Sequence, residues 1–183
     1  MKKMKRLLTT LLIALISFVA VAQNDNTIKF LGIPVDGNKK EMISKLQAKG
    51  YEYDSSSDAL TGEFNGNNVI ISVQTVNNRV WRIAIIDENI NSDVPNIRIR
   101  YNRLFEQLSN NGKYEVANGS TLGEKEDISY EMTVHDKRYD AAFAFKDKSI
   151  HGIVWYMIVK QYGKYGIVMF YENLDNAANG DDL

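Results

Sequence analysis

VIISVQTVNNRVWRIAII, residues 69–86, decides the fold of this chain, because it contains two runs of alternating side chains around a turn. In the first run, positions 69, 71 and 73 are branched apolar residues, and Ile83 and Ile85 continue the pattern in the second run. A period of two residues is typical of a β-strand, and the pair Asn77-Asn78 favours a tight turn. The stretch therefore predicts an antiparallel hairpin.

A third strand and a helix are expected before this hairpin. Leu60–Phe64 leads into Asn65-Gly66, a dipeptide typical of two-residue hairpin turns, so the hairpin extends to a three-stranded meander. A helix is expected at 38–49, where the Asn38 side chain can cap the first turn. Residues 28–33 are expected as a short strand before this helix.

The second half of the chain predicts another helix followed by strands. Pro95 suits a first helical turn, and apolar residues recur after it at helical spacing: Tyr101, Leu104, Phe105 and Leu108. Four strands are then expected, at 128–134, 139–145, 150–160 and 165–171. The last of these is a candidate edge of the sheet.

Both halves place a helix, a glycine and a Tyr-Glu pair before their hairpins, with Gly50-Tyr51-Glu52 in the first and Gly112-Lys113-Tyr114-Glu115 in the second. We interpret this order as an internal duplication. The expected fold class is α+β, with two tandem helix-plus-antiparallel-meander units at 23–91 and 92–173. Their helices are expected to pack on one face of the sheet. The alternative is an α+β chain whose halves resemble each other by chance.

The first 22 residues, Met1 to Ala22, have the pattern of a cleaved secretory signal peptide. Basic residues at positions 2, 3, 5 and 6 precede an apolar run from Leu7 to Val19, which ends in small residues. A membrane anchor is the alternative, but the run is shorter than the roughly 20 residues that cross a bilayer. We therefore expect a soluble periplasmic or secreted protein with a flexible acidic tail at 174–183.

Composition narrows the classes of function. The chain has no cysteine, which excludes disulfides, thiolate zinc sites and the lipid attachment of a diacylated lipoprotein. Without the four basic residues of the leader, 18 basic residues face 23 acidic ones, so the net charge changes from −1 to −5. Nucleic acid is not an expected partner, because its phosphates require a basic surface. No second segment is apolar and long enough to predict a transmembrane span in the mature chain.

Two segments carry a family resemblance: FLGIPVDG at 30–37 and LTGEF at 60–64. Together with the leader, the capped helix and the meander, they resemble small secreted proteins of Bacteroidetes. The tandem plan is also similar to β-lactamase-inhibitor-protein-like folds and to those of small outer-membrane-assembly lipoproteins. The chain departs from the latter because it lacks the cysteine that carries their lipid. The resemblance implies a fold and carries over no functional residue.

No motif of the sequence predicts catalysis or metal binding. His135 and His151 could bind a metal together with Asp140, but no further ligands at defined spacing accompany them. Their simpler interpretation is two histidines beside hairpin turns. A serine nucleophile would need a G-x-S-x-G turn, which is absent, and spacing cannot select a catalytic pair among Glu63, Glu131 and Asp140. We expect no enzyme, no cofactor and no metal.

Aromatic residues gather on the expected strands, and five of them are the candidate binding residues: Trp81, Trp155, Tyr156, Tyr165 and Tyr171. The strand at 150–160 is apolar at both of its alternating sets of positions. A continuous apolar strand is typical of burial on both faces, which is the interpretation that the pattern favours. The alternative is that one face stays exposed as an interaction surface.

The sequence therefore favours a secreted or periplasmic, non-enzymatic binding module whose partner is a protein of the cell envelope or the extracellular space. A glycan or small-ligand binder is the alternative, with tyrosine and tryptophan rings as stacking platforms. A hydrolase built on His135 and neighbouring acids is the third hypothesis.

Overall fold

The protein was analysed as a computed structural model that describes residues 26–177. The expected leader at 1–22 and residues 178–183 of the expected tail lie outside this range. The described part contains three helices, α2 (Lys39–Gln47), α3 (Val94–Ser109) and α4 (Ile128–Val134). It also contains ten strands: β1 (Lys29–Phe30), β2 (Ile33–Pro34), β3 (Glu52–Asp54), β4 (Ala59–Phe64), β5 (Asn67–Val76), β6 (Arg79–Asp87), β7 (Tyr114–Asn118), β8 (Asp140–Phe145), β9 (Gly152–Gln161) and β10 (Lys164–Asn173). The fold class is α+β, as predicted.

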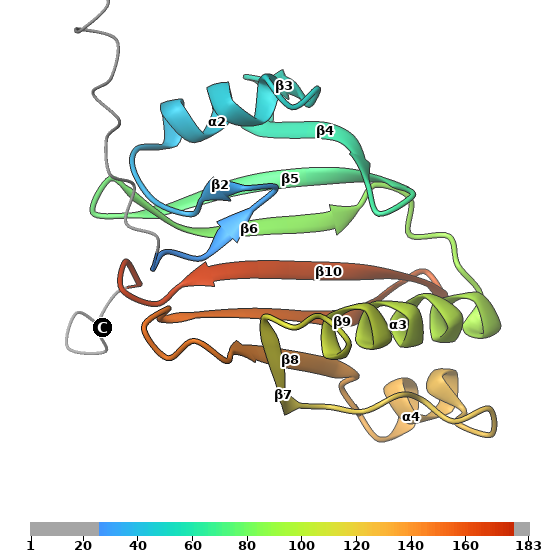
Figure 1. Cartoon of the computed structure of the whole chain (residues 1–183). Coiled ribbons are helices and arrows are strands. Elements are labelled where there is room, and N and C mark those ends of the chain that lie inside the picture. The colour runs from blue at the N-terminus through green and yellow to red at the C-terminus, as the bar shows by residue number, and fades with distance from the viewer. Residues whose placement is uncertain (1–25, 178–183) are drawn as a thin grey trace, which may run out of the picture.

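Eight of the strands form one antiparallel sheet in the order β3-β4-β5-β6-β10-β9-β8-β7, and β1 and β2 form a separate small hairpin. Read inward from either edge, each set of four strands follows chain order, and the two sets meet where β6 pairs with β10 (Figure 1). The last strand therefore lies in the middle of the sheet. Its expected position at an edge is wrong, because β10 finds a partner on each side.

The two helices expected from their capping residues are present. The Asn38 side chain accepts a hydrogen bond from the backbone N–H of Glu41 at 2.9 Å and starts α2. Gly50 follows this helix with a φ of 97°, the left-handed conformation that glycine adopts without strain. At α3, the Asp93 side chain accepts from the N–H of Asn96 at 3.0 Å, and proline occupies the first turn. Local capping chemistry therefore sets these helix starts.

The segment 128–134 is helix α4, so the strand expected there is wrong. Its N-cap is Asp127, whose side chain accepts from the N–H of Tyr130 at 3.0 Å. Positions 128 and 132 are four apart, a spacing that suits both a strand face and a helix face, and Ile128 is buried. Tyr130 and Val134, which completed the apparent alternation, are 51% and 55% exposed. The cap at Asp127 decides between the two structures.

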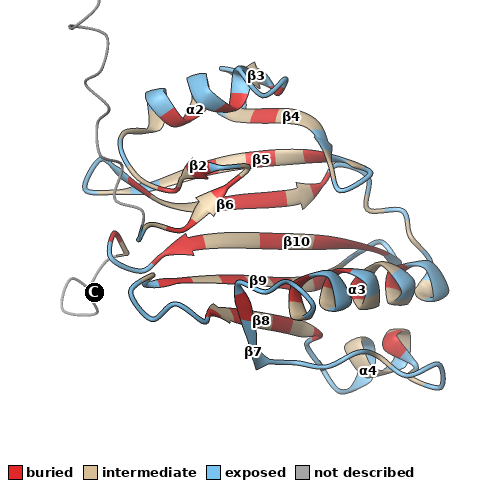
Figure 2. Ribbon diagram, viewed as in Figure 1, coloured by how far each residue is buried: buried red, intermediate tan, exposed pale blue. Residues whose placement is uncertain are grey.

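The core lies between the sheet and the segments packed against one of its faces. Tyr101 of α3 contacts Tyr156 of β9, with ring centroids 5.0 Å apart, and the Tyr156 hydroxyl donates to the Tyr101 carbonyl at 2.9 Å. Beside them, Phe105 of α3 contacts Phe143 of β8 at 5.5 Å. Buried and half-buried positions alternate along β8 and β9 (Figure 2). One sheet face therefore carries the core.

The small hairpin of β1 and β2 packs into the same core. The ring of Phe30 lies 5.3 Å from that of Phe64 on β4 and 5.0 Å from that of Tyr171 on β10. Phe30 is 1% exposed. Helix α2 contacts β3, β5 and β6, and its side chains Met42 and Leu46 are buried. The hairpin therefore joins strands that come from both halves of the chain.

Asp36 connects this N-terminal region to β6 and to the segment that follows β10. Its carboxylate accepts from the guanidinium of Arg79 at 2.9 and 3.0 Å, from the Asn176 side chain at 2.8 Å and from the N–H of Gly37 at 2.6 Å. Partial burial opposes ionisation, but the hydrogen bonds from Gly37, Asn176 and Arg79 outweigh it and lower the pKa of Asp36 below 3.8.

We expect this carboxylate to contribute stability above pH 4 that is lost in acid. A group whose pKa is lower in the folded state stabilises the fold above its unfolded pKa, and that stability falls as the pH drops through the folded pKa. At pH 7, Asp36→Asn should reduce the free energy of unfolding by about 1 kcal/mol. Urea titrations at pH 7 and pH 3 should show the difference from wild type shrinking in acid. The exposed Glu124→Gln is the control, and a difference that does not depend on pH would contradict the role of Asp36.

Candidate interaction surface on the sheet

Strand β9 has one buried face and one partly exposed face. Val154, Tyr156 and Ile158 are buried, whereas the positions between them, 153, 155, 157 and 159, are half-buried. The burial that the pattern favoured is therefore complete on one face and only partial on the other. Helix α3 packs on the side of Tyr156, and the long apolar side chains of the other side shield one another only in part.

The partly exposed side extends over five strands, and we call it the open face. The strand registers arrange its residues in three rows across β5, β6, β10, β9 and β8. The first row is Ile70, Ile86, Val168, Met157 and Asp140; the second is Ser72, Ala84, Phe170, Trp155 and Ala142; the third is Gln74, Arg82, Glu172, Ile153 and Ala144. Apolar side chains therefore dominate two rows, and the charged pair lies in the third.

Two large rings form the centre of the open face. Trp155 and Phe170 stack with centroids 4.2 Å apart and an angle of 22° between their planes. Their neighbours in the row are small, since Ala84 faces Phe170 and Ala142 faces Trp155. The alanine side chains are too small to cover the large rings. The aromatic pair therefore projects above the alanines on both sides of it in this row. Such a pair is suited to insertion into a pocket on another surface.

Arg82 and Glu172 hold the rings in place. Arg82 forms a salt bridge of 2.7 Å with Glu172, and the same carboxylate oxygen accepts from the indole N–H of Trp155 at 2.8 Å. The Arg82 guanidinium lies 3.9 Å from the centroid of the Trp81 ring and 5.1 Å from that of Phe170, which are distances of cation–π contact. The Arg82 side chain is 25% exposed and that of Glu172 is 9% exposed.

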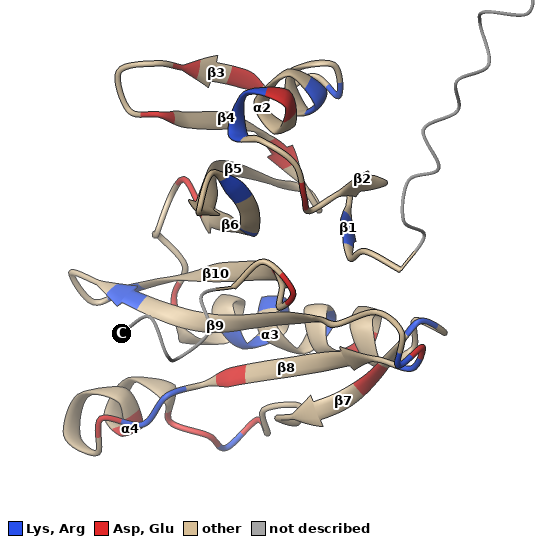
Figure 3. Cartoon of the chain, turned by 90° about the vertical axis from the view of Figure 1, so that its left-hand side faces the viewer, with Lys and Arg blue, Asp and Glu red and all other residues tan. Residues whose placement is uncertain are grey.

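This network restrains the side chains at the border of the open face. The Gln74 side chain adds a weak hydrogen bond, because its oxygen accepts from Arg82 at 3.4 Å. A partly buried ion pair that also orients two aromatic rings reduces the side-chain entropy lost on binding. Figure 3 shows that the charged positions of β8, β9 and β10 lie toward the strand ends, so the middle of these strands is uncharged.

Of the five candidate residues from the sequence, Trp155 lies on the open face, and the ring of Trp81 lies against the Arg82 guanidinium at the border of that face. Tyr156 and Tyr165 are 0% and 2% exposed and belong to the core, so their rings are not available to a partner. Tyr171 also faces the core, where it contacts Phe30, and burial raises its pKa strongly. The candidate surface therefore excludes these three tyrosines.

Sequence reasoning missed Phe170 and Arg82 as members of the surface. Phe170 had one available signal, because it alternates with Tyr171 and Met169 along the same strand. Its pairing with Trp155 and Ala84 depends on the registers of β10 with two other strands, and a single sequence does not reveal them.

The structure does not bring the candidate catalytic residues together. His135 follows α4 and its Nδ1 lies 3.0 Å from Glu131, whereas the Nδ1 of His151 lies 2.8 Å from Asp175. Asp140 accepts a hydrogen bond from the Asn118 side chain at 3.1 Å. Within residues 26–177, no group of three or more His, Asp or Glu side chains is placed to hold a metal.

Comparisons with protein-family models, curated proteins and solved structures found no match to this chain. Among the described helices, none combines the length and the apolar character needed to cross a bilayer. A functional proposal must therefore rest on the geometry of the open face.

Proposed function

We propose that this chain is a secreted or periplasmic binding module, without enzymatic activity, that binds a protein partner through the open face. The observation that carries the proposal is the stacked pair of Trp155 and Phe170, flanked by alanines and fixed by Arg82 and Glu172. Tryptophan and arginine are enriched among the residues that dominate binding energy at protein interfaces. Aromatic residues and arginine are also enriched over interface surfaces as a whole.

The proposed architecture explains why the surface lies where it does. We interpret the chain as two tandem units, at 23–91 and 92–173, with α2 and α3 on the sheet face opposite to the open face. The strand order supports this, because the last strands of the two units, β6 and β10, form the seam of the sheet. Arg82 of the first unit then pairs across the seam with Glu172 of the second. The open face therefore needs residues from both units, and it forms only when the two units share one sheet.

The chemistry of the open face favours a protein over a glycan. Sugars bind to aromatic platforms that are surrounded by hydrogen-bonding groups, but the first two rows offer polar side chains only at Ser72 and Asp140. The polar atoms of the third row largely bond to one another. A wide, mostly apolar area with an ordered arginine at its border matches the pattern of a protein interface.

The double variant Trp155→Ala/Phe170→Ala should lose binding and keep its fold. Crosslinking the mature protein in cell-envelope extract identifies the captured protein, and calorimetry with that purified protein then measures its affinity. We expect the double variant to weaken this affinity at least tenfold, because it removes the central rings of the interface. Its circular dichroism spectrum should match that of the wild type.

Tyr162→Ala is the matched control, because this side chain is 96% exposed and lies in the turn between β9 and β10. It should bind the captured protein with unchanged affinity. Equal binding by wild type and the double variant would contradict the proposal, and so would the absence of any specifically captured protein. Binding of a glycan array by the wild type, lost in the double variant, would support the alternative function instead.

A further inference from the structure

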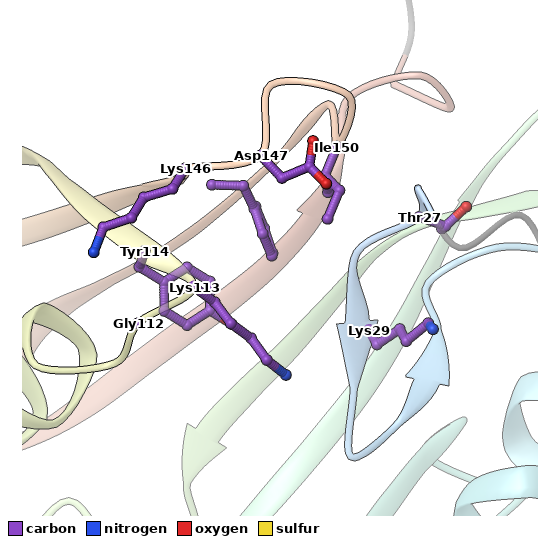
Figure 4. A pocket seen from close by; sticks show the side chains of 9 residues that line it. Thr27, Lys29, Gly112, Lys113, Tyr114, Lys146, Asp147 and Ile150 are labelled. Carbon is purple, nitrogen blue, oxygen red and sulfur yellow. The ribbon is translucent and has the colours of Figure 1, made fainter.

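A separate cavity of about 430 Å³ opens between the β1–β2 hairpin and the ends of β7 and β8 (Figure 4). This volume falls in the range of pockets that bind small organic molecules. The cavity involves none of the open-face residues. Its lining combines one apolar wall with several charged side chains. The lining residues are Thr27, Lys29, Gly112, Lys113, Tyr114, Phe145, Lys146, Asp147 and Ile150.

The apolar wall is formed by side chains that pack against the core. Tyr114 and Phe145 face each other across β7 and β8 with ring centroids 4.9 Å apart, and each is 7% exposed. Ile150 extends the wall and packs against the core. Burial raises the pKa of the Tyr114 hydroxyl, so this group stays neutral. The wall therefore offers mainly apolar surface to a ligand.

The charges around the cavity are mainly positive. Lys113 and Lys146 are neighbours across the strand pair, since the N–H of Lys146 donates to the Lys113 carbonyl at 3.0 Å. In Figure 4 the Lys113 side chain extends toward the gap between β7 and the hairpin that carries Lys29. Asp147 is the one acid among the described lining residues, and its carboxylate already accepts from the N–H and the hydroxyl of Ser149 at 3.0 and 2.7 Å.

In Figure 4 the two side chains extend in different directions, Lys113 toward the hairpin and Lys146 away from it, so the positive charge is spread over the rim of the cavity. Lysine carries its charge on a flexible stem, so these amines can reach a ligand held against the wall. From these features we infer that the cavity binds a small amphiphilic anion, a carboxylate attached to an aliphatic or aromatic body. The body packs on Tyr114, Phe145 and Ile150, and the carboxylate pairs with the lysines.

Decanoate is the probe for this site, with decyltrimethylammonium and acetate as comparisons. Calorimetry on the mature protein should detect decanoate binding and no binding of acetate, which lacks the apolar body, or of the cationic amphiphile. The variant Lys113→Met/Lys146→Met keeps the long apolar stems and removes both charges. We expect it to weaken decanoate binding at least fivefold, and methyl NMR should show the Ile150 signal shifting on decanoate addition to the wild type.

Lys148→Met is the control, because this lysine is close to Lys146 in sequence but pairs with Glu115 and is not among the residues that line the cavity. It should bind decanoate as the wild type does. The inference would be overturned if decanoate did not bind, or if the cationic amphiphile bound equally well. It would also be overturned if the double lysine variant bound decanoate with unchanged affinity. The variant Trp155→Ala/Phe170→Ala should retain decanoate binding, so the outcomes for the cavity and for the open face are independent.

Discussion

Tyr156→Ala is expected to lower the free energy of unfolding by about 3–5 kcal/mol, the range measured for large buried side chains cut to alanine. Tyr156 is fully buried in the middle of the sheet, where its ring contacts those of Tyr101 and Phe143. The substitution removes these contacts, leaves a cavity beneath α3 and deletes the hydrogen bond to the Tyr101 carbonyl. Urea unfolding followed by far-ultraviolet circular dichroism measures the loss.

The neighbouring residue gives the matched comparison. Trp155→Ala removes a side chain of similar size from the opposite sheet face, where it is half-buried, and should cost less than about 2 kcal/mol. Tyr156→Phe retains the ring and should cost about 1 kcal/mol for the lost hydrogen bond. If Trp155→Ala destabilised the protein as much as Tyr156→Ala, the open face would be part of a core, contrary to the structure.

Asp87→Ala is the second substitution with a large expected effect, about 3–5 kcal/mol. Asp87 ends β6, where its carboxylate pairs with Arg100 of α3 and accepts from the N–H of Ile167 on β10 at 2.7 Å. The side chains of Asp87 and Arg100 are 9% and 17% exposed. Removing the carboxylate therefore leaves a cation with little access to water and a buried N–H without its acceptor.

A double-mutant cycle separates the ion pair from the hydrogen bond to the backbone. Arg100→Met removes the cation that Asp87→Ala leaves without a partner. The loss of unfolding free energy in Asp87→Ala/Arg100→Met should therefore be smaller than the sum of the losses in the two single variants. Thermal and urea unfolding of the four proteins provide the coupling free energy. Additive effects would indicate that Arg100 reaches solvent freely and that Asp87 acts through Ile167 alone.

Local signals in the sequence predicted much of the fold. Asn38 and Pro95 mark helix starts because capping and first-turn preferences act within a few residues. The turns at Asn65-Gly66 and Asn77-Asn78 both adopt positive φ angles, as their residue types predict. The strand predicted at 128–134 was wrong because a short helix with apolar residues at even positions has the same alternation as a strand. The short strands β3 and β7 were missed because exposed residues dominate them and give no apolar alternation.

The candidate site was only partly predictable, for a reason specific to β9. Both of its alternating sets are apolar, so the sequence cannot say whether Trp155 or Tyr156 faces the helices. That choice is made by Tyr101 and Phe105 of α3, which pack on the side of Tyr156. The role of Arg82 depends in turn on its pairing with Glu172, a contact between strands far apart in the chain.

The seam between β6 and β10 also has a consequence for the folding pathway. Among the strands described in the large sheet, every other pairing joins consecutive strands, whereas this seam joins residues such as Asp87 and Ile167, which are 80 positions apart. Closing so long a loop is entropically slow compared with forming the local hairpins. We therefore expect the local hairpins of a refolding chain to form before the seam closes, which leaves β6 and β10 as unpaired edges until then. At high concentration two such chains can exchange these edges, so seam closure competes with domain-swapped association.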